Sequence, residues 1–183
     1  MMRYGICGFV LFAALTAVGC TPPPASNPAS QKKEAEAPAP PPSDAGRAYR
    51  LDAEPAGAKG VQAVRQDAKD GDEVVVVGRI GGSAKPFTGR AAFTIVDPVL
   101  KHCAENPDDA CPTPWDYCCV SKDDLAKATV LVKVADDQGK TRPEDARAFL
   151  GLKELQTVVV RGKAKRDDAG NLTVAAAGLF VRP

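Results

Sequence analysis

Runs of β-branched residues, separated by turns rich in glycine and proline, dominate the second half of the chain. From about Gly71 onward, five such runs are long enough for strands and too short for amphipathic helices. The third run alternates most clearly, because Val130, Val132 and Val134 share one face and Lys133 lies on the other. We therefore expect strands at 72–80, 90–97, 129–135, 157–164 and 172–181.

Helical patterns occur at two places around these strands. Residues 141–144 read T-x-x-E, a capping box, with Pro143 in the first turn and Gly151 as a C-terminal stop. This predicts a helix between the third and fourth strands. Earlier, Val61 and Val64 stand at helical spacing within residues 49–70, so we expect a short helical lead-in there.

The order of these elements, β-β-β-α-β-β, predicts a mainly β domain over residues 71–183. Five short strands with a helix between strands three and four resemble the OB-fold, a small five-stranded Greek-key barrel. Gly78 and Gly162 lie inside strands, where a small barrel needs strong bending. A small β-sandwich is the alternative. In either case a long loop, residues 98–128, joins the second strand to the third.

The N-terminus has the pattern of an export signal. One basic residue, Arg3, precedes an apolar run that ends in Ala17-Val18-Gly19-Cys20. This ending resembles the lipobox of bacterial lipoproteins, although leucine is commoner at the position of Ala17. The resemblance implies that residues 1–19 are removed and that Cys20 carries the lipid, including palmitate. An ordinary cleaved signal peptide is the alternative.

A proline- and alanine-rich segment follows the signal, and we expect residues 20–48 to be a disordered linker. Residues 21–45 contain eight prolines and six alanines and no aromatic residue, so they cannot bury a core. Such a tether suits a lipid-anchored domain. By resemblance to other lipoproteins, Thr21 after the cysteine implies the outer membrane, with the domain facing the periplasm.

Charge excludes one class of partner. Loss of Arg3 with the signal lowers the 24 basic residues to 23, which equals the 23 acidic ones. A neutral chain with 5% aromatic residues lacks both the cations and the stacking surfaces that nucleic acids require. We therefore expect no nucleic-acid partner.

Residues 98–128, here called the cysteine loop, hold most of the candidate chemistry. Four cysteines lie there with the spacing C-x7-C-x6-C-C: Cys103, Cys111, Cys118 and Cys119. An even number of cysteines in an exported domain predicts two disulfides. A bridge between the adjacent Cys118 and Cys119 would be strained, so we expect each of them to pair with Cys103 or Cys111. Both pairings remain open.

Metal or redox chemistry is the alternative use of these cysteines. Four thiolates and His102 could bind zinc, but the C-x2-C unit of structural zinc sites is absent and adjacent cysteines chelate one tetrahedral ion poorly. The C-x-x-C motif of dithiol oxidoreductases is absent too. The prediction is therefore no metal and no cofactor, with a metal-binding or thiol-redox accessory protein as the second hypothesis.

No sequence motif of a known catalytic site is present, so we expect a binding protein and not an enzyme. The candidate contact residues are Trp115, Asp116, Tyr117 and His102, because aromatic groups in a cross-linked loop lose little entropy on binding. The function expected from sequence is thus a membrane-anchored, exported scaffolding lipoprotein. Its partner would be an envelope protein, a peptide or a glycan.

Overall fold

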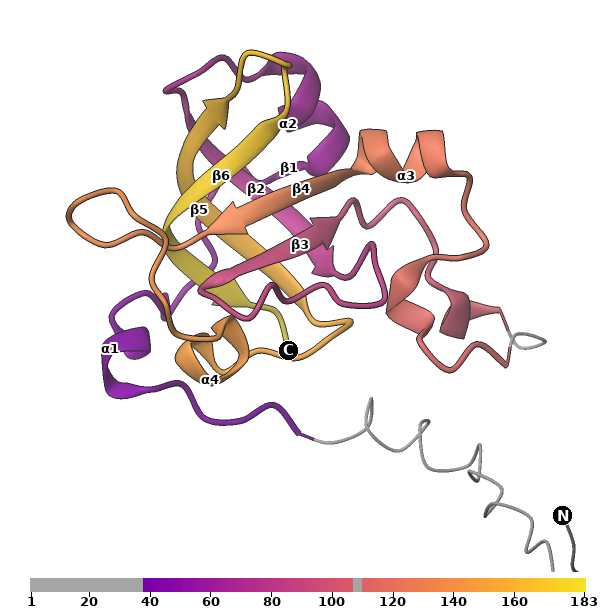
Figure 1. Ribbon diagram of the computed structural model, residues 1–183, viewed down its shortest axis with the longest axis horizontal. Helices are drawn as coiled ribbons and strands as arrows, with labels where there is room; N and C mark the ends of the chain where they lie inside the picture. Colours follow the sequence, from indigo (N-terminus) through magenta and orange to yellow (C-terminus); the bar gives the residue numbers. More distant parts are fainter. Residues whose placement is uncertain (1–37, 107–109) are drawn as a thin grey trace, which may run out of the picture.

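The computed structural model describes residues 38–106 and 110–183. Five strands form a closed barrel, which confirms the expected OB-like architecture (Figure 1): β2 (Glu73–Ile80), β3 (Ala92–Val96), β4 (Thr129–Lys133), β5 (Thr157–Arg166) and β6 (Leu172–Val181). The order around the barrel is β2-β3-β4-β6-β5, and β5 pairs again with β2 to close it. Only the β4–β6 pair of these five strands is parallel.

Short elements surround the barrel. The structure adds β1 (Lys59–Gly60), which pairs in parallel with β2, and the helices α1 (Asp44–Arg47), α2 (Val61–Asp67), α3 (Lys122–Ala128) and α4 (Ala146–Leu150). Two single-turn 3₁₀ helices, η2 (Cys103–Glu105) and η3 (Pro114–Asp116), lie in the cysteine loop. In Figure 1 this loop and α3 lie on one side of the barrel, opposite the hairpin that follows β4.

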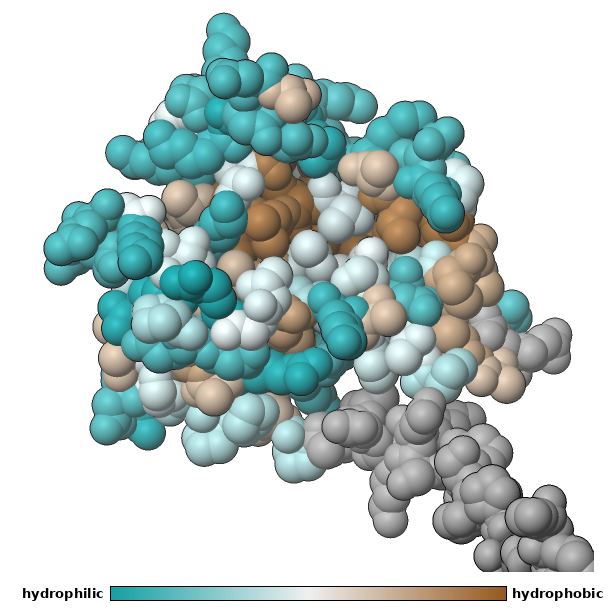
Figure 2. All heavy atoms as spheres, viewed as in Figure 1, coloured by the Kyte–Doolittle hydropathy of each residue, from teal (hydrophilic) through white to brown (hydrophobic). Residues whose placement is uncertain are grey.

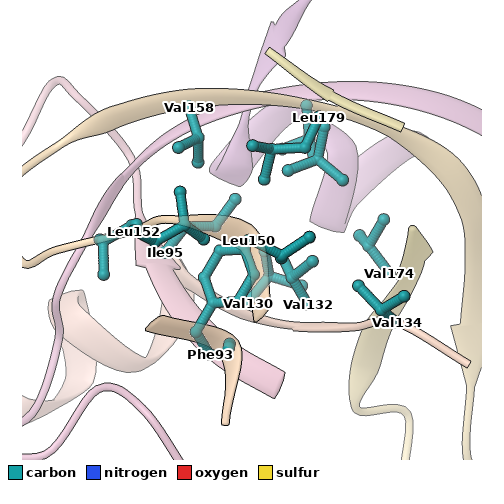
Figure 3. Close-up of a cluster of buried hydrophobic side chains, with 14 of the residues drawn as sticks. Phe93, Ile95, Val130, Val132, Val134, Leu150, Leu152, Val158, Val174 and Leu179 are labelled. Carbon is teal, nitrogen blue, oxygen red and sulfur yellow. The ribbon is translucent and has the colours of Figure 1, made fainter. Parts of the chain in front are cut away.

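Aliphatic side chains from every barrel strand and from α2 and α4 fill the interior (Figure 3). Valine dominates this core, as expected for a chain with few aromatic residues. Gly162 lies at a bulge between β5 and β6, where a Cβ atom would stand 2.2 Å from the carbonyl oxygen of Ala175. Gly78 similarly lets Ile95 approach β2. Both glycines thus permit the close approach that barrel closure needs.

The predicted capping box is wrong. Helix α4 begins after Asp145, whose carboxylate accepts a hydrogen bond from the Arg147 amide at 2.8 Å, and Thr141 instead pairs with Ala135. Pro143 consequently precedes the helix. The C-terminal stop is correct, since Gly151 adopts φ 67° and its N–H donates to the carbonyl of Arg147. An aspartate next to the helix competes better for its N-terminal amides than a threonine four residues away.

The lead-in agrees with expectation, whereas the linker differs from it in part. The lead-in helix exists as α2, and its Val61 and Val64 are buried in the barrel core. Residues 38–48 were expected to belong to the disordered linker, but they lie against α4. The Ser43 amide donates to the Phe149 carbonyl at 3.1 Å, and Gly46 is buried. The signal, Cys20 and the rest of the linker lie outside the described residues.

Candidate metal centre

The cysteine loop leaves the barrel at a buried carboxylate. Asp97 is only 7% exposed, and its two oxygens accept the amides of Gln62, at 2.9 Å, and Val99, at 3.1 Å. The Gln62 amide belongs to the N-terminal turn of α2, so Asp97, which follows β3, caps a helix that lies earlier in the chain. The start of the loop is therefore fixed to the barrel.

Tyr117 fixes the far part of the loop. It adopts a left-handed backbone conformation with φ 60°, and its side chain is fully buried beside Val96 and Ala128. That conformation costs a non-glycine residue about 1–2 kcal/mol, which burial of the ring offsets. The inward turn of Tyr117 leaves Cys118 and Cys119 exposed. One buried side chain thus sets the direction of the residues that follow it.

Two hydrogen bonds hold the same region to the segment after β2. The Gly82 amide donates to the Trp115 carbonyl at 2.8 Å, and the Trp115 indole donates to the Ala84 carbonyl at 3.2 Å. Space is tight here, because a Cβ at Gly81 would lie 2.5 Å from the Trp115 oxygen and 2.9 Å from the Tyr117 ring. The absence of a side chain at position 81 therefore lets the loop dock closely.

Four ligand atoms converge on this frame. The sulfur atoms of Cys103, Cys111 and Cys118 and a carboxylate oxygen of Asp116 all lie within 4.8 Å of one another. We call these four residues the ligand cluster. Cys103 comes from η2 and Asp116 from η3, so the two 3₁₀ turns carry ligands from distant parts of the loop.

The Asp116 carboxylate organises the cluster. Its Oδ1 accepts the Cys118 amide at 2.9 Å and lies 3.9 Å from the sulfurs of both Cys103 and Cys111. Its Oδ2 accepts the Thr113 hydroxyl at 2.8 Å. The carboxylate is thus oriented toward the sulfur atoms by hydrogen bonds from both sides, as second-shell groups orient the ligands of metal sites.

The sulfur separations match metal ligation better than covalent bridging. The Sγ of Cys118 lies 3.4 Å from that of Cys103 and 3.6 Å from that of Cys111. A disulfide requires about 2.05 Å, and no disulfide is formed among the described residues. A tetrahedral ion with sulfur ligands at about 2.3 Å holds its sulfurs about 3.8 Å apart. The expected bridges are therefore not present in this structure.

Protonation opposes metal binding at one ligand. Hydrogen bonds with the thiols of Cys103 and Cys111 raise the pKa of Cys118 above its ordinary value, and the Asp116 charge acts in the same direction. A neutral thiol is thus favoured at Cys118 when no ion is bound. Metal binding at this position must displace a proton.

His102 contributes to the support of the loop and not to the ligand cluster. Its Nε2 lies 3.1 Å from Glu105 Oε1, which also forms an ion pair with Arg79 of β2 at 2.7 Å. Burial and the positive charge of Arg79 lower the pKa of His102, although Glu105 opposes this shift. The His102 ring also meets the Tyr117 ring edge-on, with centroids 6.4 Å apart. These contacts join η2 to the barrel.

The sequence-predicted contact residues are only partly available to a partner. Tyr117 is wrong as a contact residue because it is fully buried. Trp115 and Asp116 are partly exposed, and the His102 side chain is 14% exposed. The fourth cysteine, Cys119, is exposed, and its sulfur lies 4.0 Å from that of Cys118. The adjacent cysteines thus contribute one member to the ligand cluster, which resolves the objection that two neighbours chelate one ion poorly.

A separate groove lies on the barrel wall between β3 and β4. Its volume is about 310 Å³, and its lining includes Ala92, Leu131, Arg90, Lys133 and Lys140. Figure 2 shows hydrophobic atoms in the hollowed middle of this face, with hydrophilic side chains around them. None of the ion pairs between described residues includes any of the three cations of the groove. Sequence reasoning missed it, because strand order alone brings these residues together.

The fold and the ligand cluster together define an OB-like barrel with a cysteine- and aspartate-lined site on one long loop. No protein-family model matches the chain, and a search of curated proteins also finds no match. In the part of the chain that the structure describes, no helix has both the length and the apolar character needed to cross a bilayer.

Proposed function

We propose that this chain is an exported, lipid-anchored metal-binding protein, in which the barrel supports a loop that binds a zinc-class ion. The observation that carries the proposal is the convergence of the ligand cluster, three thiols and one carboxylate within 4.8 Å. Thiolates select zinc and copper(I), and a carboxylate as fourth ligand favours zinc over copper(I). Four ligands from the protein fill a tetrahedral shell, which suits binding and not catalysis.

The location rests on the N-terminal pattern. The apolar run before Cys20 and the proline-rich segment after it support export and lipid anchoring. Labelling of producing cells with radioactive palmitate tests this point: the wild-type chain should incorporate label and fractionate with the envelope, and Cys20→Ala should do neither. Wild-type protein that carries no palmitate label and lies in the soluble fraction contradicts the proposed lipid anchor but leaves the metal proposal intact.

Cobalt provides the direct test of the metal site. The mature protein, purified in detergent under reducing conditions, is titrated with Co²⁺ and then with Zn²⁺. We expect a thiolate-to-cobalt charge-transfer band, the intense visible bands of tetrahedral cobalt, a stoichiometry of one, and loss of both signals as zinc displaces cobalt. Cobalt spectra of an octahedral, oxygen-bound ion contradict the proposal.

Two matched variants assign the ligands. Cys118→Ser removes a member of the ligand cluster, and we expect zinc affinity to fall by more than about 100-fold, which exceeds the usual cost of losing an outer-shell partner. Cys119→Ser alters the neighbouring exposed thiol, and it should leave the cobalt spectrum and the affinity nearly unchanged. Equal losses in the two variants argue against the assignment.

Binding of an anionic envelope partner is the second candidate function. The groove between β3 and β4 favours it, because its three cations surround an apolar floor formed by Ala92 and Leu131. Such a lining complements an acidic glycan, with charge steering the encounter. This candidate keeps the scaffolding role expected from sequence but moves the contact from the cysteine loop to the barrel wall.

Salt dependence and charge reversal test this second function. A sulfated polysaccharide serves as the probe, and its affinity for the purified mature protein should fall steeply with salt. Lys133→Glu and Lys140→Glu together should abolish binding without changing the cobalt spectrum. Binding that survives both substitutions places the contact elsewhere.

A further inference from the structure

Cys118 lies at the centre of the sulfur contacts. Its sulfur is 3.4 Å from Cys103, 3.6 Å from Cys111 and 4.0 Å from Cys119. The sulfur that would bind the ion therefore lies within 4.0 Å of the sulfur of each of the other three cysteines in the loop. The inference drawn below, that oxidation of this sulfur controls metal binding, rests on the proposed function, because it concerns the same metal site.

Metal binding and disulfide formation are mutually exclusive at this sulfur. A bridge from Cys118 to Cys103 or Cys111 would bring two sulfurs to about 2.05 Å, whereas a tetrahedral ion spreads them to about 3.8 Å. The contacts at 3.4 and 3.6 Å lie between these limits, so small movements reach either state. Either bridge also removes two of the three thiolates, which leaves one sulfur and one carboxylate for the ion.

Exposure sets the order of events. Cys118 is exposed, whereas Cys103 is 3% exposed and lies beneath the ligand cluster. An oxidant arriving from solvent therefore meets Cys118 first, and a buried or half-buried neighbour completes the bridge. The backbone limits the alternative, because a bridge between Cys118 and Cys119 would close a strained eight-membered ring.

We propose that the cysteine loop is a redox-controlled metal site, which holds zinc when reduced and releases it when Cys118 forms a disulfide with Cys103 or Cys111. The oxidant class is a disulfide, either of low molecular mass or on a protein. In the zinc-loaded site zinc has displaced the Cys118 proton, so the Cys118 sulfur attacks the oxidant as a thiolate, one thiolate leaves, and a mixed disulfide forms. The neighbouring thiolate then attacks the Cys118 sulfur and expels the second thiolate.

The reaction balances as a two-electron exchange. Two protein thiolates are oxidised to one sulfur–sulfur bond, and the oxidant disulfide is reduced to two thiolates. Zinc keeps its charge and leaves because its ligands have been consumed. The remaining cysteines, Cys111 or Cys103 with Cys119, could form a second bridge with a second oxidant molecule. The two disulfides expected from sequence would then be the fully oxidised form of this site.

Glutathione disulfide provides the test. Zinc-loaded mature protein is mixed with it in the presence of a zinc-responsive dye, and zinc release and thiol loss are followed together. We expect two thiols lost for each zinc released, and a fall in zinc affinity of more than about 100-fold in the oxidised protein. Digestion without reductant should give a cross-linked peptide that contains Cys118, bridged to Cys103 or Cys111, and reductant should restore binding.

The variant Cys119→Ser is the matched control, since this thiol lies outside the ligand cluster. It should bind zinc and release it on oxidation as the wild-type protein does. A bridge mapped to Cys118–Cys119, zinc that stays bound after two thiols are lost, or a Cys119→Ser protein that no longer responds overturns the inference. Absence of zinc binding by the fully reduced protein instead rejects the proposed function itself, so the two failures are distinguishable.

Discussion

The barrel buries one continuous cluster of aliphatic and aromatic side chains. In the cysteine loop, Tyr117 and Ala128 join Val96 of β3 in a second, small cluster, and the partly buried Leu100, Val120 and Leu125 pack against it. Strand ladders on both sides stabilise the barrel, but two 3₁₀ turns, the short helix α3 and a few hydrogen bonds stabilise the loop. The barrel is thus stabilised by apolar burial together with strand pairing. The loop has the smaller buried cluster, so an ion bound to the ligand cluster, as proposed above, would add a larger share of its stability.

Truncation of a barrel core residue should have the largest effect on stability. Phe93 of β3 is fully buried, and Phe93→Ala should lower the free energy of unfolding by about 3–5 kcal/mol through lost burial and the cavity left behind. Urea unfolding of the reduced, metal-free protein measures this loss. Added zinc should recover little of it, and full recovery by zinc would contradict the separation of barrel and loop.

Tyr117→Ala should have the complementary effect. Without the buried ring, nothing offsets the left-handed backbone at φ 60°, so the loop should lose its frame. We expect zinc affinity to fall by about 100-fold, near the upper end for loss of a supporting group. The barrel should remain folded, which far-ultraviolet circular dichroism and urea unfolding check. Wild-type affinity in Tyr117→Ala would show that the loop is held in another way.

The contrast between the two regions also explains how much the sequence could predict. Strand positions follow from alternation and turn residues, which are local, and the β-β-β-α-β-β order then favours an OB-like barrel over a small β-sandwich. The strand at 172–181 coincides with β6, and the third strand is two residues shorter than expected. These patterns are reliable because one buried face repeats along each strand.

The site could be predicted only in part, because its contacts are long-range. The sequence identifies the four cysteines, but their spacing predicted two disulfides, whereas the structure places Asp116 among three sulfurs. Spacing cannot show that Tyr117 turns inward while Asp116 before it and Cys118 after it both join the ligand cluster. Likewise Asp97 caps α2 across 35 residues of chain, a contact that no local motif encodes.

The pH dependence of metal binding tests the chemistry of the loop. The pKa of Cys118 is raised in the metal-free fold, so its thiol remains neutral at neutral pH and must lose a proton to bind zinc. Zinc affinity should therefore fall by at least about tenfold for each unit that the pH drops between about pH 8 and pH 6. Competition with a chelator of known pH dependence measures it, and a flat profile contradicts thiolate ligation.

The raised pKa of Cys118 opposes zinc binding, but it favours folding of the metal-free protein. A thiol whose pKa is raised on folding stabilises the fold below its unfolded pKa, near 9, and that stabilisation is lost as the pH rises through the folded value. Alkylation of Cys118 by iodoacetamide at pH 8 should consequently be slower in the folded protein than in urea. Because Cys118 is exposed, slow alkylation would report its protonation and not its burial.

Replacing either of two nearby glycines by alanine should affect a different region, the cysteine loop for Gly81 and the barrel for Gly78. A Cβ at Gly81 would meet the Trp115 oxygen at 2.5 Å, and a Cβ at Gly78 would meet Ile95 at 2.8 Å. Gly81→Ala should weaken zinc binding by about tenfold, the lower end for loss of a supporting contact, with little change in barrel stability. Gly78→Ala should do the reverse, with a loss of about 1–3 kcal/mol from overpacking. Zinc titration and urea unfolding measure both, and similar effects of the two substitutions would contradict the separation.

The smallest effect concerns the cap of α4, on the barrel side. Asp145→Ala removes the carboxylate that accepts the Arg147 amide, and the free energy of unfolding should fall by about 1 kcal/mol. Thr141→Ala, at the position that the sequence pattern indicated, should cost less because Thr141 does not cap the helix. Zinc affinity should be unchanged in both variants, since α4 lies on the barrel and carries no ligand. A larger loss of unfolding free energy in Thr141→Ala than in Asp145→Ala would support the capping box that the sequence predicted. Weaker zinc binding in Asp145→Ala would show that the barrel and the cysteine loop are coupled.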